Sequence, residues 1–174
     1  ASSAASDVYK RQPSENAILT DRVIDRPMRP LFPKDYRNDV ALNNLVMSVD
    51  PDCSPELTAM LGSAIATAIS DIPFDGPTAS TMVGLIDGEF VINPTSAQKE
   101  VSDLALTVAS TREKVIMIEA GANEVPEDKM IEAIFKAHEV NKAVIKFIDR
   151  IVEECGKEKH EYCLLYTSDA ADEA

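Results

Sequence analysis

Four cationic side chains lie within residues 20–34 of a chain whose formal net charge is −13. They are Arg22, Arg26, Arg29 and Lys34. A guanidinium group offers planar, forked donors that match phosphate oxygens, so this cluster favours an anion-binding role. The alternative is a surface loop whose arginines pair with neighbouring carboxylates, and the spacing favours neither interpretation over the other. Those carboxylates are Asp21, Asp25 and Asp35.

The same stretch contains three prolines, at positions 27, 30 and 33. Each proline fixes φ and removes a backbone donor, and the residue before it is biased away from the helical region. We therefore expect residues 20–34 to form a stiff, extended strap rather than a long helix. Such a strap would hold its arginines at set positions.

The next elements predicted by the sequence are a strand and a helix. Residues 41–49 are mostly apolar and predict a strand. Ser54 is placed to cap a helix over residues 56–69, with Pro55 at its first position. The small residues of this helix suit close packing against a sheet, which we expect to be mixed.

Four further strands are expected, at residues 81–86, 89–92, 104–109 and 114–119. Asp87-Gly88 predicts a two-residue hairpin turn between the first two, and Gly121 should end the last. Because these strands alternate with helical patterns, the fold class is α+β.

A long helix should follow, opening at Pro126 with an acidic first turn and stopping at Gly156. We expect it to leave the edge of the sheet. Its apolar residues recur at three- and four-residue steps and predict one apolar face: Met130, Ile131, Ile134, Phe135, Val144, Ile145, Ile148, Ile151 and Val152. His138 lies along this stripe with no second ligand nearby, so a packed histidine is expected rather than a metal site.

Composition narrows the functional classes. An acidic surface repels nucleic acid as a whole, so any binding must be local. Cys53 and Cys155 show no pattern typical of a disulfide framework or a zinc site. No apolar stretch is long enough to span a bilayer, and no membrane partner is expected.

The two ends of the chain are related to each other as DNA. One set of codons for residues 2–12 has a reverse complement that, in a shifted frame, encodes residues 163–173. The shared element resembles a transposon-based sequencing adapter. We therefore interpret residues 1–12 and 163–174 as adapter-derived and expect the natural sequence to be a fragment, 13–162.

Several strings in residues 13–160 resemble the first RNase PH-like repeat of the bacterial polynucleotide phosphorylase family. The first is Thr-Asp-Arg-Val-Ile-Asp-Arg-Pro-Met-Arg-Pro-Leu-Phe, from Thr20 to Phe32. Others are Arg37-Asn-Asp-Val40, Ser48-Val-Asp-Pro51, Ser70-Asp-Ile-Pro-Phe-Asp-Gly-Pro77, Ile86-Asp-Gly-Glu-Phe-Val-Ile-Asn-Pro-Thr95 and Glu119-Ala-Gly-Ala122.

The resemblance implies a partial RNase PH-like fold, of the ribosomal protein S5 domain 2-like type. Residues 13–125 would form the first RNase PH-like domain, without its N-terminal strands. Residues 126–162 would be the repeat's last helix or the start of an all-helical linker. A second repeat and RNA-binding domains would lie outside this chain.

The activity implied by the family is 3′-to-5′ phosphorolytic degradation of RNA, with inorganic phosphate as co-substrate and Mg²⁺ bound in the second repeat. The implied partners are single-stranded RNA, two further copies in a homotrimeric ring and a larger RNA-decay assembly; DNA is not expected. The implied location is the bacterial cytoplasm.

This repeat departs from the family's catalytic pattern. Where the active repeat has consecutive phosphate-binding serines, this sequence has Ser54-Pro55-Glu56; where it has two aspartates proposed to hold magnesium, Lys99 and Ala105 stand. Asp103 remains nearby, but one carboxylate beside a lysine makes a poor magnesium site. We therefore expect a non-catalytic repeat and no catalytic or metal-binding residues here. The alternative is a free-standing single-repeat phosphorolytic ribonuclease.

The resemblance also places the arginine segment near the RNA path. It implies backbone contacts from Arg22, Arg26 and Arg29, and further along from Lys34 and Arg37. Asp25 would either orient these arginines or neutralise them. The family's aromatic and basic loop would lie before residue 13, so no base-stacking platform is expected within the chain.

Overall fold

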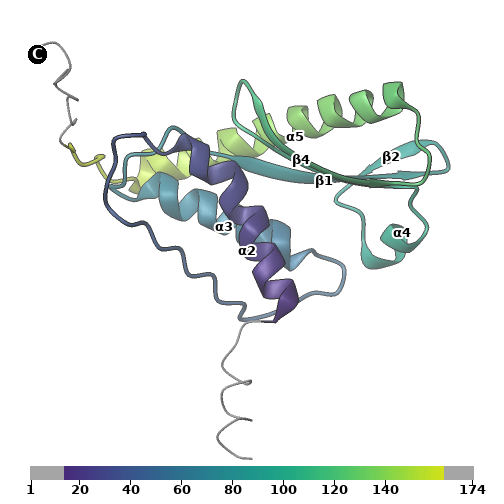
Figure 1. Ribbon diagram of the computed structural model, residues 1–174, viewed down its shortest axis with the longest axis horizontal. Helices are drawn as coiled ribbons and strands as arrows, with labels where there is room; N and C mark the ends of the chain where they lie inside the picture. The colour runs from purple at the N-terminus through teal and green to yellow at the C-terminus, as the bar shows by residue number, and fades with distance from the viewer. Residues whose placement is uncertain (1–13, 163–174) are drawn as a thin grey trace, which may run out of the picture.

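A single four-stranded sheet forms the centre of the molecule, with helices on both faces (Figure 1). The computed structural model describes residues 14–162, and the expectations for residues 1–13 and 163–174 lie outside that range. In chain order the elements are α2 (Glu15–Met28), the 3₁₀ turn η1 (Arg29–Leu31), α3 (Pro55–Ile69), β1 (Ala79–Ile86), β2 (Glu89–Ile92), α4 (Ser96–Glu100), β3 (Leu104–Ser110), β4 (Val115–Ala122) and α5 (Glu127–Cys155).

The strand order is β2-β1-β3-β4, and every neighbouring pair is antiparallel. The described sheet is therefore not mixed, contrary to the expectation. The predicted β1–β2 hairpin is confirmed: Asp87 and Gly88 both have positive φ, 50° and 82°, as a primed turn requires. Gly121 does not end β4, because it pairs with Ala105 inside the ladder and the strand continues to Ala122.

Helix α5 covers one face of the sheet. Leu104, Leu106 and Val108 alternate along β3 and pack against Ala133 and Ala137. The two alanines have no bulk beyond Cβ, so the helix approaches the strands closely and buries the β3 side chains almost completely. This helix therefore lies across the sheet rather than leaving its edge. Its second half packs against α3 through residues that include Ala64, Ala68 and Ile148.

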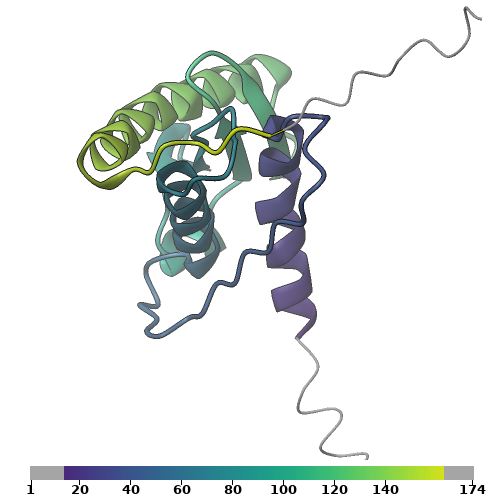
Figure 2. The ribbon, with the colours of Figure 1, turned by 90° about the vertical axis from the view of Figure 1, so that its left-hand side faces the viewer.

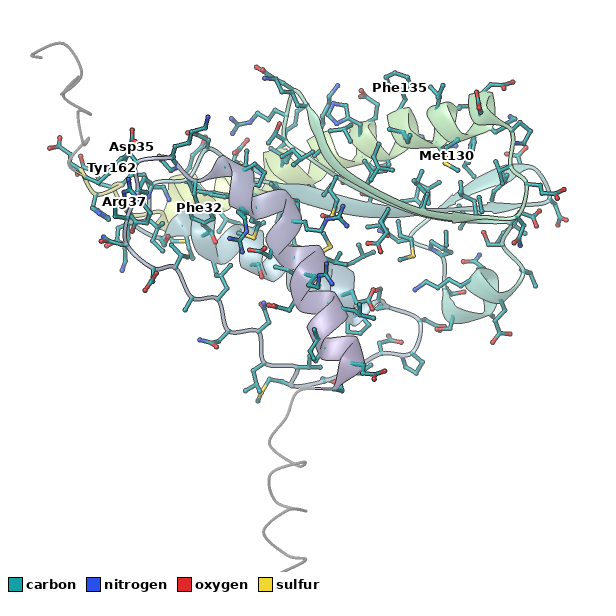
Figure 3. The ribbon with its side chains drawn as sticks, viewed as in Figure 1. Phe32, Asp35, Arg37, Met130, Phe135 and Tyr162 are labelled. Carbon is teal, nitrogen blue, oxygen red and sulfur yellow. The ribbon has the colours of Figure 1, made fainter. Side chains whose placement is uncertain are left out.

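Not every apolar residue of α5 faces the core. Ile131 is 54% exposed and Phe135 66% exposed, and Figure 3 shows Phe135 pointing away from the sheet. The prediction of one apolar face was wrong at these two positions. At 100° per residue they lie about 120–160° around the helix from Ala133 and Ala137, on the side that faces away from the sheet. His138 is packed as expected, with its Nδ1 3.0 Å from the Ser110 hydroxyl.

Helices α2 and α3 cover part of the opposite face (Figure 2). Their buried side chains Ile24, Met28 and Met60 pack with Ala109 of β3 and Met117 of β4. The predicted small-residue helix is confirmed as α3, with Ser54 at the N-cap and Pro55 in the first turn.

The strap prediction was wrong, because most of residues 20–34 is helical. Ser14 caps α2 by accepting a hydrogen bond from the Ala17 amide (3.2 Å), and the helix continues through Pro27. A proline in the last turn removes one intrahelical bond and leaves the earlier turns intact, whereas a mid-helix proline costs about 3 kcal/mol. The following prolines then convert the helix into the short 3₁₀ turn and end it.

Residues 41–49 do not form the predicted strand. They are irregular, and Leu45 and Met47 are 81% and 85% exposed. A strand needs a partner for its backbone groups, and none of the described strands pairs with this segment. The side chain of Asn44 ties it to α3, donating to the Ser63 hydroxyl at 3.0 Å and accepting from it at 3.2 Å.

Candidate nucleic-acid interface

Helix α2 and its C-cap residue, which still has helical backbone angles, align three arginines on one exposed face. Arg22, Arg26 and Arg29 are spaced i, i+4 and i+7, which at 100° per residue puts them within a narrow sector of the helix surface. Ile24 and Met28 occupy the opposite, buried sector. The row extends roughly 10 Å along the axis at 1.5 Å per residue. The helix, and not an extended strap, holds the guanidinium groups in register.

The three arginines differ in their carboxylate partners. Arg29 forms a two-point ion pair with Asp25: Nε and Nη2 donate to the two carboxylate oxygens at 2.8–2.9 Å. The pair is open to solvent, with the Arg29 side chain 77% exposed and the Asp25 side chain 46% exposed. Within residues 14–162, Arg22 and Arg26 have no ion-pair partner. Local pairing therefore holds for Arg29, and anion binding by Arg22 and Arg26 stays a prediction.

A groove of about 390 Å³ lies beside this row, between α2 and the irregular segment around residues 40–44. Arg22 and Arg29 line it together with Asp21 and Asp25. The groove lining carries both signs of charge and is not uniformly positive. An anionic chain could therefore contact the arginines only one at a time.

The remaining two predicted cations, Lys34 and Arg37, follow η1 in an exposed turn closed by a hydrogen bond from the Tyr36 amide to the Pro33 carbonyl (3.1 Å). Figure 3 shows Arg37 and Tyr162 at the end of the molecule where α2 finishes. Lys34 and Arg37 thus follow the arginine row along the chain, in the turn just beyond the C-terminal end of α2.

Residues 157–162, which the sequence did not single out, fasten this end of the molecule. The Lys157 amide donates to the Ile69 carbonyl (2.9 Å) and the His160 amide to the Asp71 carbonyl (2.8 Å). The Lys159 ammonium donates to three carbonyl oxygens at 2.6–3.1 Å, those of Thr67, Ala68 and Ser70. These bonds pair carbonyls at and just beyond the C-terminus of α3, where the Thr67 carbonyl also accepts a hydrogen bond from the Ser70 hydroxyl (2.8 Å). Burial lowers the pKa of Lys159, and the nearby Asp71 carboxylate opposes that shift.

Comparisons with known proteins identify the family. A model described as "3′ exoribonuclease family, domain 1" matches residues 1–73, and one described as "3′ exoribonuclease family, domain 2" matches residues 76–140. The chain belongs to the 3′ exoribonuclease family. It is an RNase PH-like region, and the crystal structure of rice (Oryza sativa) Rrp46 shares the fold. That similarity has a TM-score of 0.64 at 11% identity and covers 82% of this chain and 68% of the rice protein.

Curated family members are much more similar in sequence. A polyribonucleotide nucleotidyltransferase of Lachnoclostridium phytofermentans is 85% identical over 149 residues, which are 86% of this chain and 21% of that protein. The corresponding protein of Alkaliphilus oremlandii is 61% identical over 88% of this chain and 22% of its own length. The chain therefore spans about a fifth of the length of the relatives it matches.

The family's catalytic positions can now be placed in the structure. Ser54 at the start of α3 and Lys99 on α4 line one groove of about 260 Å³, together with Asp52. Ser96 at the start of α4 donates to the Pro51 carbonyl, which draws α4 toward the loop before α3. The groove thus brings together two of the positions that the resemblance linked to phosphate and metal.

The side chains at these positions do not fit a magnesium ion. Lys99 brings a positive charge to the groove, and Ala105, on β3, has no donor atom. Magnesium needs several oxygen ligands in octahedral geometry, and the groove lining offers one carboxylate, that of Asp52. Among the described residues, no three His, Cys, Asp or Glu side chains form a group that could hold a metal ion.

None of the helices between residues 14 and 162 combines the length and apolar character that a bilayer crossing needs.

Proposed function

We propose that this chain is a non-catalytic RNase PH-like repeat of a bacterial phosphorolytic 3′-to-5′ exoribonuclease, where it guides single-stranded RNA. The observation that carries the proposal is the exposed row of Arg22, Arg26 and Arg29 on α2. Cations in such a row contact phosphates without reading bases, as a processive exonuclease requires. Lys34 and Arg37 extend the same contact surface.

The chemistry would take place elsewhere in the whole enzyme. Phosphorolysis needs bound inorganic phosphate and stabilisation of the leaving 3′-oxygen. Here Pro55 removes a backbone donor at the start of α3, and Glu56 puts a negative charge where phosphate would bind. Phosphate and Mg²⁺ would therefore be held by a second repeat of a cytoplasmic, ring-forming homotrimer, with this repeat supplying RNA contacts and ring interfaces.

Salt-dependent RNA binding by the full chain tests the RNA contacts. Each phosphate contact to a single strand contributes about 0.7 to the slope of log affinity against log salt. Replacing Arg22, Arg26 and Arg29 by alanine should reduce that slope by about 1.4, because Asp25 already holds Arg29 in an ion pair. The slope is measured by fluorescence anisotropy on a labelled oligo(A). The matched control replaces three cations of α5, namely Lys129, Lys136 and Arg150. Equal losses in the two triple variants would contradict a contact surface on α2.

A graft tests the role in the enzyme. Residues 14–162 would replace their counterparts in the L. phytofermentans relative, to which the chain is 85% identical. The triple arginine variant of this graft should raise KM for RNA, with little change in kcat or in KM for phosphate, because its defect lies in RNA binding. The chain alone should release no nucleoside diphosphates from poly(A) with phosphate and Mg²⁺. Such release would instead support the single-repeat ribonuclease.

A further inference from the structure

Three aromatic rings from opposite ends of the sequence meet beyond the end of α2. The Tyr36 ring centroid lies 5.7 Å from that of His160 and 5.7 Å from that of Tyr162, with interplanar angles of 54° and 84°. His160 is exposed and the two tyrosines are half-buried. We call these three residues the aromatic cluster. It lies on the side of the molecule where the cationic turn ends (Figure 3).

The aromatic cluster is flanked by charges of both signs, with the carboxylates of Asp35 and Glu161 next to its tyrosines in the sequence and two exposed cations nearby. Lys34 and Arg37 stand on either side of Tyr36 in the sequence; both are exposed, and neither forms an ion pair with any residue in the range 14–162. Arg29 precedes them on the 3₁₀ turn that joins α2 to this segment. An RNA strand that follows the arginine row toward the C-terminal end of α2 would arrive at these rings.

The aromatic cluster is also held in place before any ligand binds. The bonds of Lys157, Lys159 and His160 to the end of α3 fix the backbone that carries two of its rings. The third ring follows η1, whose Leu31 carbonyl accepts a hydrogen bond from the Asp75 amide (2.9 Å). Figure 2 shows the tail after α5 passing the end of α3 toward the end of α2. A ring fixed in this way has little rotational freedom to lose on binding.

We propose that Tyr36, His160 and Tyr162 form a stacking subsite for an unpaired RNA base, with Lys34 and Arg37 contacting the adjoining phosphates. This subsite rests on the proposed function, because it would bind the same RNA strand as the arginine row of α2. Aromatic faces combined with nearby cations are the usual means of holding single strands without sequence preference. The subsite would supply a stacking platform that was not expected from the sequence within this chain.

The rings could instead serve only to hold residues 157–162 against the rest of the chain. Base stacking can be distinguished from this structural role by how RNA affinity depends on salt and on the presence of bases. A stacked base contributes affinity that depends weakly on salt, whereas each cation contributes to the salt slope. A base-free strand cannot stack at all. We therefore compare oligo(A) with an abasic ribose-phosphate strand of the same length, using the full chain and anisotropy across a range of salt concentrations.

Tyr36→Leu and Tyr162→Leu should each weaken oligo(A) binding by about 5- to 150-fold, the range found when a stacking aromatic is truncated. Neither should change the salt slope or the affinity for the abasic strand. Tyr162→Phe, which keeps the ring, should bind oligo(A) like the wild type. Lys34→Ala with Arg37→Ala should instead reduce the slope by about 1.4 on both strands.

Two variants keep the test valid if the tyrosine replacements unfold the chain. His160→Ala removes an exposed ring and keeps the backbone amide that bonds to Asp71. Lys159→Met frees the tail and removes no ring. Both should weaken oligo(A) binding and spare the abasic strand. Equal losses on the two strands, or no loss on oligo(A), would overturn the stacking subsite. If wild-type affinity for both strands lacked salt dependence, the proposed function itself would fail.

Discussion

Replacing Asp25 by asparagine decides whether that carboxylate orients the arginine row or neutralises it. In the structure Asp25 holds Arg29 by a two-point ion pair that is largely open to water. Asparagine keeps the shape and removes the charge, so Arg29 becomes free to turn toward a phosphate. We expect Asp25→Asn to bind RNA more tightly than the wild type, because the open pair neutralises Arg29 more than it positions it.

The size of the gain follows from Coulomb's law. A carboxylate about 7 Å from an RNA phosphate repels it by about 0.6 kcal/mol in water, before screening. With Debye lengths of about 30 Å at 0.01 M and about 8 Å at 0.15 M, the gain is about 2-fold at low salt and about 1.5-fold at physiological salt. A new phosphate contact by Arg29 would also steepen the salt slope by about 0.7. The loss of an exposed ion pair should cost under about 1 kcal/mol of stability.

Anisotropy titrations of oligo(A) at several salt concentrations measure both quantities. The matched control is Asp87→Asn, which removes the same charge in the β1–β2 turn and keeps a residue type that tolerates positive φ. It should leave binding nearly unchanged. If Asp25→Asn bound RNA more weakly than the wild type while Asp87→Asn did not, Asp25 would be an orienting residue and the neutralisation argument would be refuted.

Other expected outcomes concern stability and the chain ends. The buried Asn141 side chain accepts a hydrogen bond from the Thr81 hydroxyl (2.7 Å) and donates to the Ser110 hydroxyl (2.9 Å) and the Val108 carbonyl (3.0 Å). Asn141→Leu should lower the unfolding free energy by about 1–3 kcal/mol, because it leaves the buried Thr81 hydroxyl without an acceptor. Urea melts measure this loss, and adding Thr81→Val should recover part of it. Because the pKa of Lys159 is lowered in the folded chain, the unfolded chain binds the ammonium proton more tightly. Raising the pH toward 10.5 should therefore increase the unfolding free energy of the wild type relative to that of Lys159→Met. Sequencing the gene from unfragmented DNA should show different codons at positions 1–12 and 163–174.

The elements whose signals are local could be predicted from the sequence. The Asp87-Gly88 turn, the Ser54-Pro55 helix start and the Gly156 stop each depend on a few adjacent residues, and all three are present in the structure. Helix α2 was not predicted, because the prolines at 27, 30 and 33 suggest extended backbone, whereas Pro27 lies in the last turn of the helix and the other two lie beyond it. Ser14 as an N-cap and the i, i+4 pair Ile24 and Met28 are the signals that indicate a helix there.

That error changed the meaning of the arginine spacing. Along an extended chain, Arg22 and Arg26 would lie on one face and Arg29 on the other, because successive side chains point to opposite faces. On a helix the same spacing places Arg22, Arg26 and Arg29 in one row. The aromatic cluster could not be found in this way, because Tyr36 and Tyr162 become neighbours only once the tail has docked on α3. Likewise residues 41–49 look like a strand, but pairing requires a partner that local composition does not report.

The charges around α3 support the proposal that RNA contacts α2 rather than the start of α3 in this repeat. A helix N-terminus favours one nearby anion and its C-terminus one nearby cation, each worth about 0.3–1 kcal/mol. In this chain Glu56 supplies the anion and Lys159 the cation. Both ends of the α3 dipole are therefore satisfied by the protein's own side chains, so a phosphate at Ser54 would have to displace or repel Glu56. The arginines of α2 face no such competitor except at Arg29, where the Asp25 carboxylate can be removed and the consequence measured.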